Sequence, residues 1–235
     1  MPRPVRASLV AVFVILLVAC TTACQYDRES RLAEVRALHA AGQFDESIAP
    51  LRVLLTAEAE HPEANYRLGV ALVQTGRPSL AIWPLQKATR SEEFKILAGL
   101  LLASTLLQGE SFEEAIRAAD GVLTIEPDRV AALYTRARAN IGAGRPSDAL
   151  VDSDHVLQLR PDDFMGTTLR VAALVDLKRF DEAEAMHVQL KEARESAGDD
   201  DSAARACAIL SQFYLSQDRI DEATETVLSC IERYL

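Results

Sequence analysis

A repeat of 34 residues constrains this chain more than any other feature of its sequence. One series of positions recurs in steps of 34, 34, 34, 34 and 40 residues: Phe44, Pro78, Phe112, Pro146, Phe180 and Ile220. A small residue stands three positions after each of them: Ser47, Ala81, Ala115, Ala149, Ala183 and Ala223. A period of this length is typical of a stacked array of similar structural units.

Each unit is predicted to be a helix, a turn and a second helix. In the second unit the stripe of Leu68, Leu72 and Val73 predicts a helix over 63–74, and a second helix follows Gly76 over 79–89. The low aromatic content, 6%, also favours helices over a β-sandwich. Small residues let the two helices approach closely, and a bulky one there would cost about 1–3 kcal/mol. The predicted helix-packing residues are Gly69, Ala81, Ala103, Ala115, Ala137, Ala149, Ala183 and Ala223.

The pattern resembles that of tetratricopeptide repeat (TPR) proteins. The resemblance is carried by Leu68-Gly69, by Phe112 to Ala115 with Pro127, and by Phe180 to Ala183. It implies an all-α, right-handed superhelical α-solenoid of about six helix-turn-helix units. These cover residues 28–61, 62–95, 96–129, 130–163, 164–203 and 204–235. The six-residue excess of the fifth unit is predicted to form an exposed loop over 196–202.

The resemblance also implies a function, because the first helices of such units line a concave groove that binds peptides or helices of other proteins. The candidate groove residues are mainly apolar or aromatic, with isolated arginines: Arg36, Tyr66, Val70, Val73, Leu97, Leu100, Ser104, Tyr134, Arg138 and Ile141. Packing between neighbouring units remains an alternative role for each. The clamp with which some family members bind a chaperone's terminal carboxylate is not expected, because Leu32, Arg67 and Leu100 stand at its places.

The first residues predict an export signal. Arg3 and Arg6 make the start of the chain basic. The apolar run 7–19 comes next and is too short to span a bilayer as a helix. The following Leu17-Val18-Ala19-Cys20 resembles the lipobox of bacterial lipoproteins. An ordinary signal peptide or an uncleaved anchor is the alternative.

The lipobox resemblance implies that residues 1–19 are removed and that Cys20 receives the lipid (palmitate). Residues 20–27 would then tether the repeat domain, 28–235, to the membrane. Cys24 is a less suitable lipidation site, because it lacks the apolar residue three positions upstream. The expected location is the bacterial cell envelope, with the body in the periplasm and the outer membrane favoured if the cell is Gram-negative.

The sequence contains no recognisable catalytic or cofactor-binding set. The histidines His39, His61, His155 and His187 are scattered, and no glycine-rich phosphate loop is present. We expect Asp152, Asp154 and His155 to form a solvated helix face rather than a metal site, and residues 199–201 to form a solvated acidic turn. The net charge of −10 argues against nucleic acid as a partner. A protein without enzymatic activity, metal, cofactor or small-molecule substrate is therefore predicted.

Cys207 and Cys230 lie on the two helices of the sixth unit. Because these helices run antiparallel, the start of the first meets the end of the second, and the two thiols can face each other. The oxidising periplasm permits a disulfide between them. The alternative, that both are small buried apolar residues, remains open.

The resulting prediction is a lipid-anchored scaffold that binds proteins in the groove during cell-envelope assembly. Two alternatives remain: a lipoprotein of pilus or secretion-system biogenesis, and the N-terminal part of a longer protein whose activity lies beyond residue 235. A purely structural role without a groove ligand is a third. The sequence does not name the partner, the pathway or the organism.

Overall fold

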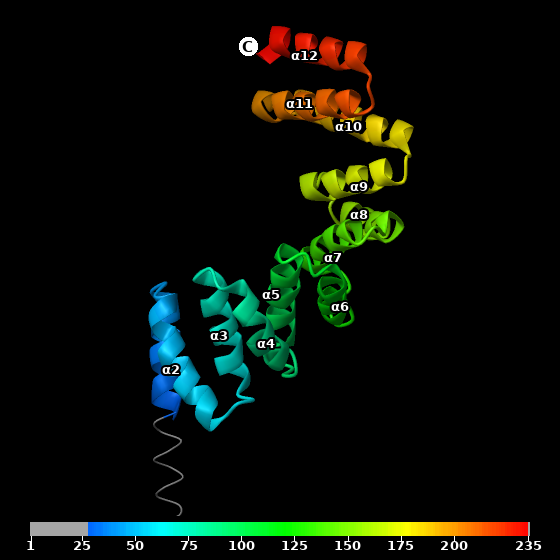
Figure 1. Cartoon of the computed structure of the whole chain (residues 1–235). Helices are drawn as coiled ribbons and strands as arrows, with labels where there is room; N and C mark the ends of the chain where they lie inside the picture. Colours follow the sequence, from blue (N-terminus) through cyan, green and yellow to red (C-terminus); the bar gives the residue numbers. More distant parts are fainter. Residues whose placement is uncertain (1–27, 235) are drawn as a thin grey trace, which may run out of the picture. The chain divides into compact units, whose positions relative to one another are not determined.

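The computed structural model describes residues 28–234, and all the regular elements in that range are α-helices (Figure 1). The prediction of an all-α repeat array is confirmed. The predicted helices of the second unit, 63–74 and 79–89, correspond to α3 (Pro62–Gln74) and α4 (Pro78–Ala88), so their bounds agree within one residue.

The chain divides into two compact parts, which meet in sequence between Gly109 and Glu110. The N-terminal part contains a helix over residues 28–40 followed by α2 (Phe44–Ala57), α3, α4 and α5 (Lys95–Gln108). Within this part α2 packs on α3, α3 on α4 and α4 on α5, and α3 also contacts α5.

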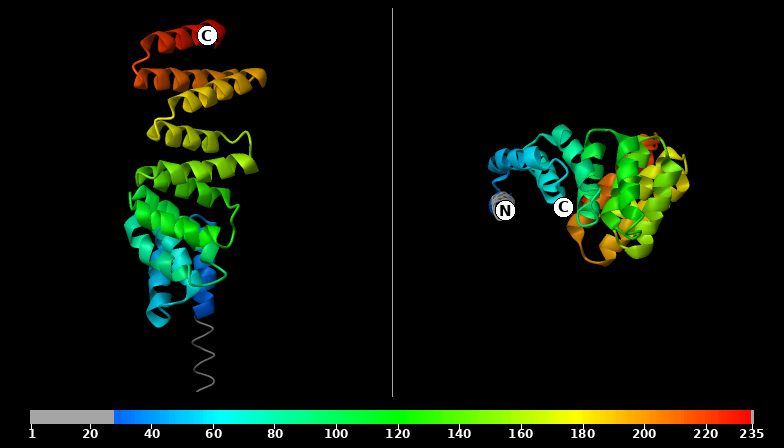
Figure 2. Two further views of the ribbon diagram at one scale, coloured as in Figure 1. Left: turned by 90° about the vertical axis from the view of Figure 1, so that its right-hand side faces the viewer. Right: turned by 90° about the horizontal axis from the view of Figure 1, so that it is seen from below.

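The C-terminal part contains seven helices among its described residues, and each packs on the next (Figure 2). α7 also contacts α9. The seven helices are α6 (Phe112–Leu123), α7 (Val130–Gly142), α8 (Pro146–Leu159), α9 (Phe164–Asp176), α10 (Phe180–Ser196), α11 (Asp200–Ser216) and α12 (Ile220–Tyr234). We call the first helix of each repeat helix A and the second helix B, so that α7 and α8 are the A and B helices of the fourth repeat.

The 34-residue period marks the start of every helix B. Its six members are the first residues of α2, α4, α6, α8, α10 and α12. Two residues earlier the backbone has a positive φ, which turns the chain from helix A into helix B. This position is a glycine in the first, second and fourth repeats (Gly42, Gly76 and Gly144). In the third, fifth and sixth repeats it is Glu110, Lys178 and Asp218. The turn residue of the third repeat is therefore Glu110, and the preceding Gly109 has a negative φ of −86°.

The eight predicted helix-packing residues are all buried. Ala81, Ala115, Ala149 have no exposed surface at all. At Gly69 an added Cβ would lie only 2.4 Å from Cδ2 of Leu85, so even alanine would force that leucine to move. Close approach of the A and B helices explains why the period carries small residues at these places.

Arginines that immediately precede a helix B tie neighbouring B helices together. Arg77 donates to Asp45 of α2, and Arg145 donates to Glu113 of α6 over 2.6 Å. In the last repeat Arg219 donates to Glu184 of α10 over 2.5 Å. These pairs are partly exposed, so each contributes little to stability.

The extra residues of the fifth repeat do not form the loop predicted over 196–202. α10 continues through Ser196 and α11 begins at Asp200, so the excess lengthens both helices to 17 residues. The acidic run is the start of α11 rather than a free turn, and Asp199 caps it by accepting a hydrogen bond from the N–H of Ser202. Carboxylates are favourable at this end of a helix because of its dipole.

A disulfide joins Cys207 of α11 to Cys230 of α12, with their Cα atoms 6.4 Å apart. Of the two possibilities that the sequence leaves open, the structure has the bonded one. The bond joins two cysteines that are 23 positions apart in the sequence, and it holds the two helices of the sixth repeat together. A loop of this length stabilises the folded state by about 3 kcal/mol in the chain-entropy model.

Candidate functional site

The candidate groove residues fall in both compact parts of the chain, and we describe each set separately. Those of the N-terminal part, from Arg36 to Ser104, are half-buried or exposed, and we call them the N-terminal A-helix face. Leu97 is 48% exposed, and Leu100 is half-buried on the same helix, α5. The Tyr66 ring lies 5.3 Å from that of Phe94, which fixes its position on this face. Apolar side chains thus remain accessible to a partner here.

Arg36, the cation of this face, is held by two carboxylates. Its Nη2 and Nε donate to Glu63 over 2.5 and 2.8 Å, and its Nη1 donates to Glu29 over 2.9 Å. Arg67 donates to the same Glu63 over 2.6 Å. Hydrogen bonds from Arg36, followed in importance by those from Arg67, lower the pKa of Glu63 to about 2 against the opposing effect of burial. Arg36 therefore organises the face as part of an ion-pair network.

Replacing Glu63 by glutamine should reduce the free energy of unfolding by about 1–2 kcal/mol at pH 7, a value that allows for the partial solvation of Arg36. Because the pKa of Glu63 is lower in the folded chain than its ordinary 4.5, the carboxylate stabilises the fold above pH 4.5. That contribution is lost as the pH falls from 4.5 towards 2. Urea denaturation of the wild type and of Glu63→Gln should show that the difference between their free energies of unfolding disappears as the pH falls across this range. The control is Glu34→Gln, at an exposed position, and its free energy of unfolding should equal that of the wild type. A difference between Glu63→Gln and the wild type that does not change with pH would contradict the ion-pair account.

In the C-terminal part the candidate residues Tyr134, Arg138 and Ile141 lie on α7. Arg138 is exposed, whereas Tyr134 and Ile141 pack against a buried cluster formed by Ala137, Ala149, Leu169 and Ala173. Burial, together with the nearby Asp163, raises the pKa of Tyr134 to about 12. Packing between repeats, the alternative considered for each candidate, is therefore part of the role of Tyr134 and Ile141.

The expectation of a solvated face at Asp152, Asp154 and His155 is wrong for Asp152, which is only 2% exposed. Arg136 of α7 donates to both of its carboxylate oxygens over 2.6 and 3.0 Å, and to Asp120 of α6 over 2.6 Å. Burial raises the pKa of Asp152, while the ion pair opposes that shift. Arg136 thus links the B helices on either side of it.

The histidines make structural contacts. Nδ1 of His61 accepts from the N–H of Ala64 at the start of α3, and Nε2 of His39 lies 3.0 Å from Oγ of Ser47. His155 pairs with Asp128 over 2.8 Å, and burial lowers the pKa of His187. Within residues 28–234 no three His, Cys, Asp or Glu side chains are placed so that they could hold a metal ion.

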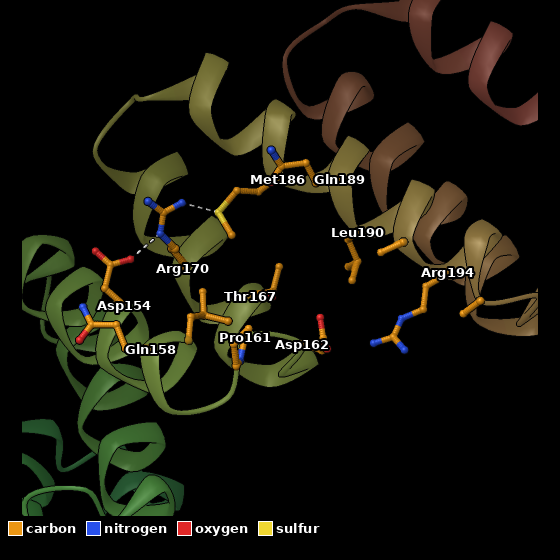
Figure 3. A pocket seen from close by; sticks show the side chains of 13 residues that line it. Asp154, Gln158, Pro161, Asp162, Thr167, Arg170, Met186, Gln189, Leu190 and Arg194 are labelled. Carbon is orange, nitrogen blue, oxygen red and sulfur yellow. Dashed lines mark hydrogen bonds and ion pairs between the residues drawn. The ribbon is translucent and has the colours of Figure 1, made fainter.

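A cleft that the sequence analysis did not identify lies between α8, α9 and α10 (Figure 3). It has a volume of about 740 Å³. Its walls include Leu157 of α8, Thr167 of α9, and Leu190 of α10, with Arg170 and Arg194 at its two ends. We call it the fifth-repeat cleft. A comparison of equivalent positions in the fourth and fifth repeats is the sequence signal that could have revealed it.

The tetratricopeptide repeat profile matches residues 32–92 and 100–164, which together make up more than half of the chain. The chain therefore belongs to the tetratricopeptide repeat family. The chain matches no curated protein sequence. None of the described helices is long and apolar enough to cross a membrane.

Solved structures of this family have the same fold. A tetratricopeptide repeat protein from Parabacteroides merdae is similar with a TM-score of 0.70 and 16% identity, over 88% of this chain and 80% of its own. The protein MamA is similar with a TM-score of 0.67 and 19% identity, over 73% of this chain and 94% of its own. MamA from Desulfovibrio magneticus is similar with a TM-score of 0.54 and 15% identity, over 87% of this chain and 93% of its own. Identities this low establish the fold alone.

Proposed function

We propose that this protein is a lipid-anchored scaffold that binds other proteins through its A-helix faces in the cell envelope. The observation that carries the proposal is the N-terminal A-helix face, where Tyr66, Leu97 and Leu100 stay accessible although the repeat cores beside them are fully packed. Repeat proteins use such surfaces to bind peptides or helices. Aromatic and aliphatic anchors of this kind dominate the energy of protein interfaces.

The membrane part of the proposal rests on the sequence around Cys20, which lies outside the described residues. A dually or triply acylated N-terminus is enough for stable anchoring without a spanning helix. The acidic body would be repelled by anionic headgroups, so the lipid is the component that supplies membrane affinity. A lipid-anchored repeat array would present its binding faces close to the membrane on which assembly takes place.

Replacing Tyr66, Leu97 and Leu100 by serine should abolish partner binding without unfolding the chain, because these side chains are only partly buried. Photocrosslinking in intact cells, with the probe next to the face, should give specific adducts in the wild type and lose them in the triple variant. Circular dichroism should show an unchanged helical signal.

The matched control replaces Leu80 and Trp83 of α4 by serine. These two are also apolar and are 57% and 63% exposed, but they lie on a helix B. Adducts should persist in this control. Loss of the adducts in the control together with their persistence in the triple variant would place partner binding on the B helices instead.

A further inference from the structure

The fourth and fifth repeats hold equivalent arginines in different surroundings. Arg136 on α7 and Arg170 on α9 are 34 residues apart and occupy the same repeat position. Arg136 has two carboxylate partners, Asp120 on the preceding helix B and Asp152 on the following one. In the fifth repeat the corresponding residues are Asp154 and Met186.

Arg170 therefore lacks one of the two carboxylates that the fourth repeat provides. Its Nε donates to Asp154 over 2.5 Å, while its Nη1 faces the sulfur of Met186 (Figure 3). A thioether is neutral and only a weak acceptor. The second side of the guanidinium thus has no anionic partner at the place where Asp152 satisfies Arg136.

Smaller side chains open the fifth-repeat cleft at this same place. The fully packed Leu133 of the fourth repeat is replaced by Thr167, and Leu159 is replaced by Ala193. The hydrogen bond between His155 and Asp128 also has no counterpart, since Gln189 and Asp162 stand at the equivalent positions. The volume that these replacements free is accessible from outside and contains Arg170 in its wall.

Arg194, at the other end of the cleft, is a second cation, and the carboxylate that it influences is that of Asp199, which does not line the cleft. It also lines a smaller cavity of about 240 Å³ that contains Phe164 and Arg205. The carboxylates in the cleft are Asp154, already bound to Arg170, and Asp162. The cleft lining thus carries two arginines and two aspartates, and Arg205 of the smaller cavity adds a third cation in a chain whose net charge is −10.

We propose that the fifth-repeat cleft binds an extended acidic segment of a partner protein. One carboxylate of that segment pairs with Arg170 as Asp152 pairs with Arg136, and a second one reaches Arg194. Apolar side chains of the segment lie between them on Leu157 and Leu190. Charge-assisted hydrogen bonds from arginine to carboxylate are among the strongest in proteins.

The dimensions of the cleft favour a peptide over a small anion. Its wall follows α10 from Met186 to the residue after its end, Ala197, a distance of about 16 Å along a helix. This length accommodates about five residues of extended chain.

The cleft is separate from the surface of the A helices that carries the candidate groove residues. On α9 the positions equivalent to Tyr134, Arg138 and Ile141 are 168, 172 and 175, and a helix turns by about 100° per residue. Thr167 and Arg170 therefore point to a different side of α9. The cleft proposal rests on the proposed function in one respect only, namely that the partner is a protein.

The test uses the full-length protein in detergent and two blocked, fluorescent peptides of about eight residues. In the first peptide glutamates alternate with leucine and serine; in the second, glutamine replaces every glutamate. Fluorescence anisotropy should show that the acidic peptide binds at least about tenfold more tightly. Equal affinities would overturn the proposal.

Met186→Asp is the decisive variant, because it supplies Arg170 with the internal carboxylate of the fourth repeat. It should weaken acidic-peptide binding by about tenfold or more. Ala185→Asp adds the same charge to the exposed side of α10, outside the cleft, and should leave affinity unchanged. Undiminished binding to Met186→Asp, or an equal loss in both variants, would overturn the proposal.

A second variant, Thr167→Leu with Ala193→Leu, fills the cleft with the side chains of the fourth repeat and should also abolish peptide binding. It decides the question if Met186→Asp does not fold. Retained peptide binding in this filled variant would overturn the proposal. Because the peptide assay does not involve the A-helix faces, its failure leaves the crosslinking result of the Tyr66, Leu97 and Leu100 variant unaffected.

Discussion

Replacing Ala149 by tryptophan is expected to reduce the free energy of unfolding by about 3 kcal/mol or more. Ala149 of α8 has no exposed surface and lies in a buried cluster with Ala137, Leu169 and Ala173. An indole ring at this position has no space unless the helices separate. Urea denaturation followed by circular dichroism measures the effect. The equivalent replacement at Ala115, also fully buried, should act in the same way.

The matched control for Ala149 is Val151→Trp, two residues along the same helix. Val151 is 67% exposed, so the ring would extend into solvent and stability should change by less than about 0.5 kcal/mol. Since α8 packs on both α7 and α9, the damage from Ala149→Trp should spread to the neighbouring repeats. Wild-type stability of Ala149→Trp would show that the assigned repeat register is wrong.

Replacing Cys20 by alanine is expected to move the protein from the membrane fraction to the soluble fraction, or to leave an unprocessed precursor in the membrane. The reason is that lipid attachment requires the thiol of this residue, and the acidic body has no electrostatic attraction to anionic lipids. Fractionation of cells, with mass spectrometry of the N-terminal peptide, measures both outcomes.

Cys24→Ala is the matched control, because Cys24 lies close by but lacks the upstream apolar residue of a lipobox. Anchoring and processing should be unchanged in this variant. Normal processing and full membrane retention of Cys20→Ala, without lipid at residue 20 of the wild type, would refute the anchor. Release of the protein from the membrane only in Cys24→Ala would show that Cys24 carries the lipid.

The sequence was sufficient to predict the helices and their packing positions. Small residues at Gly69, Ala81 and Ala149 recur with a fixed period because close helix contacts recur, and such a pattern is readable without a structure. Turn residues were less readable. Glu110 adopts a positive φ that favours glycine, and only its place in the period, not its residue type, indicates the turn.

The burial of Asp152 and the fifth-repeat cleft were not predicted, since both depend on contacts between helices rather than on a local pattern. Asp152 is buried because Arg136, on another helix, neutralises it. The cleft follows from what stands at equivalent positions of two repeats, Thr167 for Leu133 and Met186 for Asp152. Similarly, a run of glycine and aspartates near residue 199 resembles a loop, but α10 continues to Ser196, α11 begins at Asp200, and the two helices pack on each other.

The pairing of helices has a consequence for how the chain reaches its native state. Within each of the two compact parts, the contacts between α2 and α5 and those between α6 and α12 join only helices that are neighbours or next neighbours in the sequence. Chains dominated by such local contacts fold quickly, in microseconds to milliseconds for helical proteins. A helical hairpin also finds its packing partners without waiting for distant segments. A chain that enters its compartment one segment at a time can therefore fold in the order in which its repeats emerge.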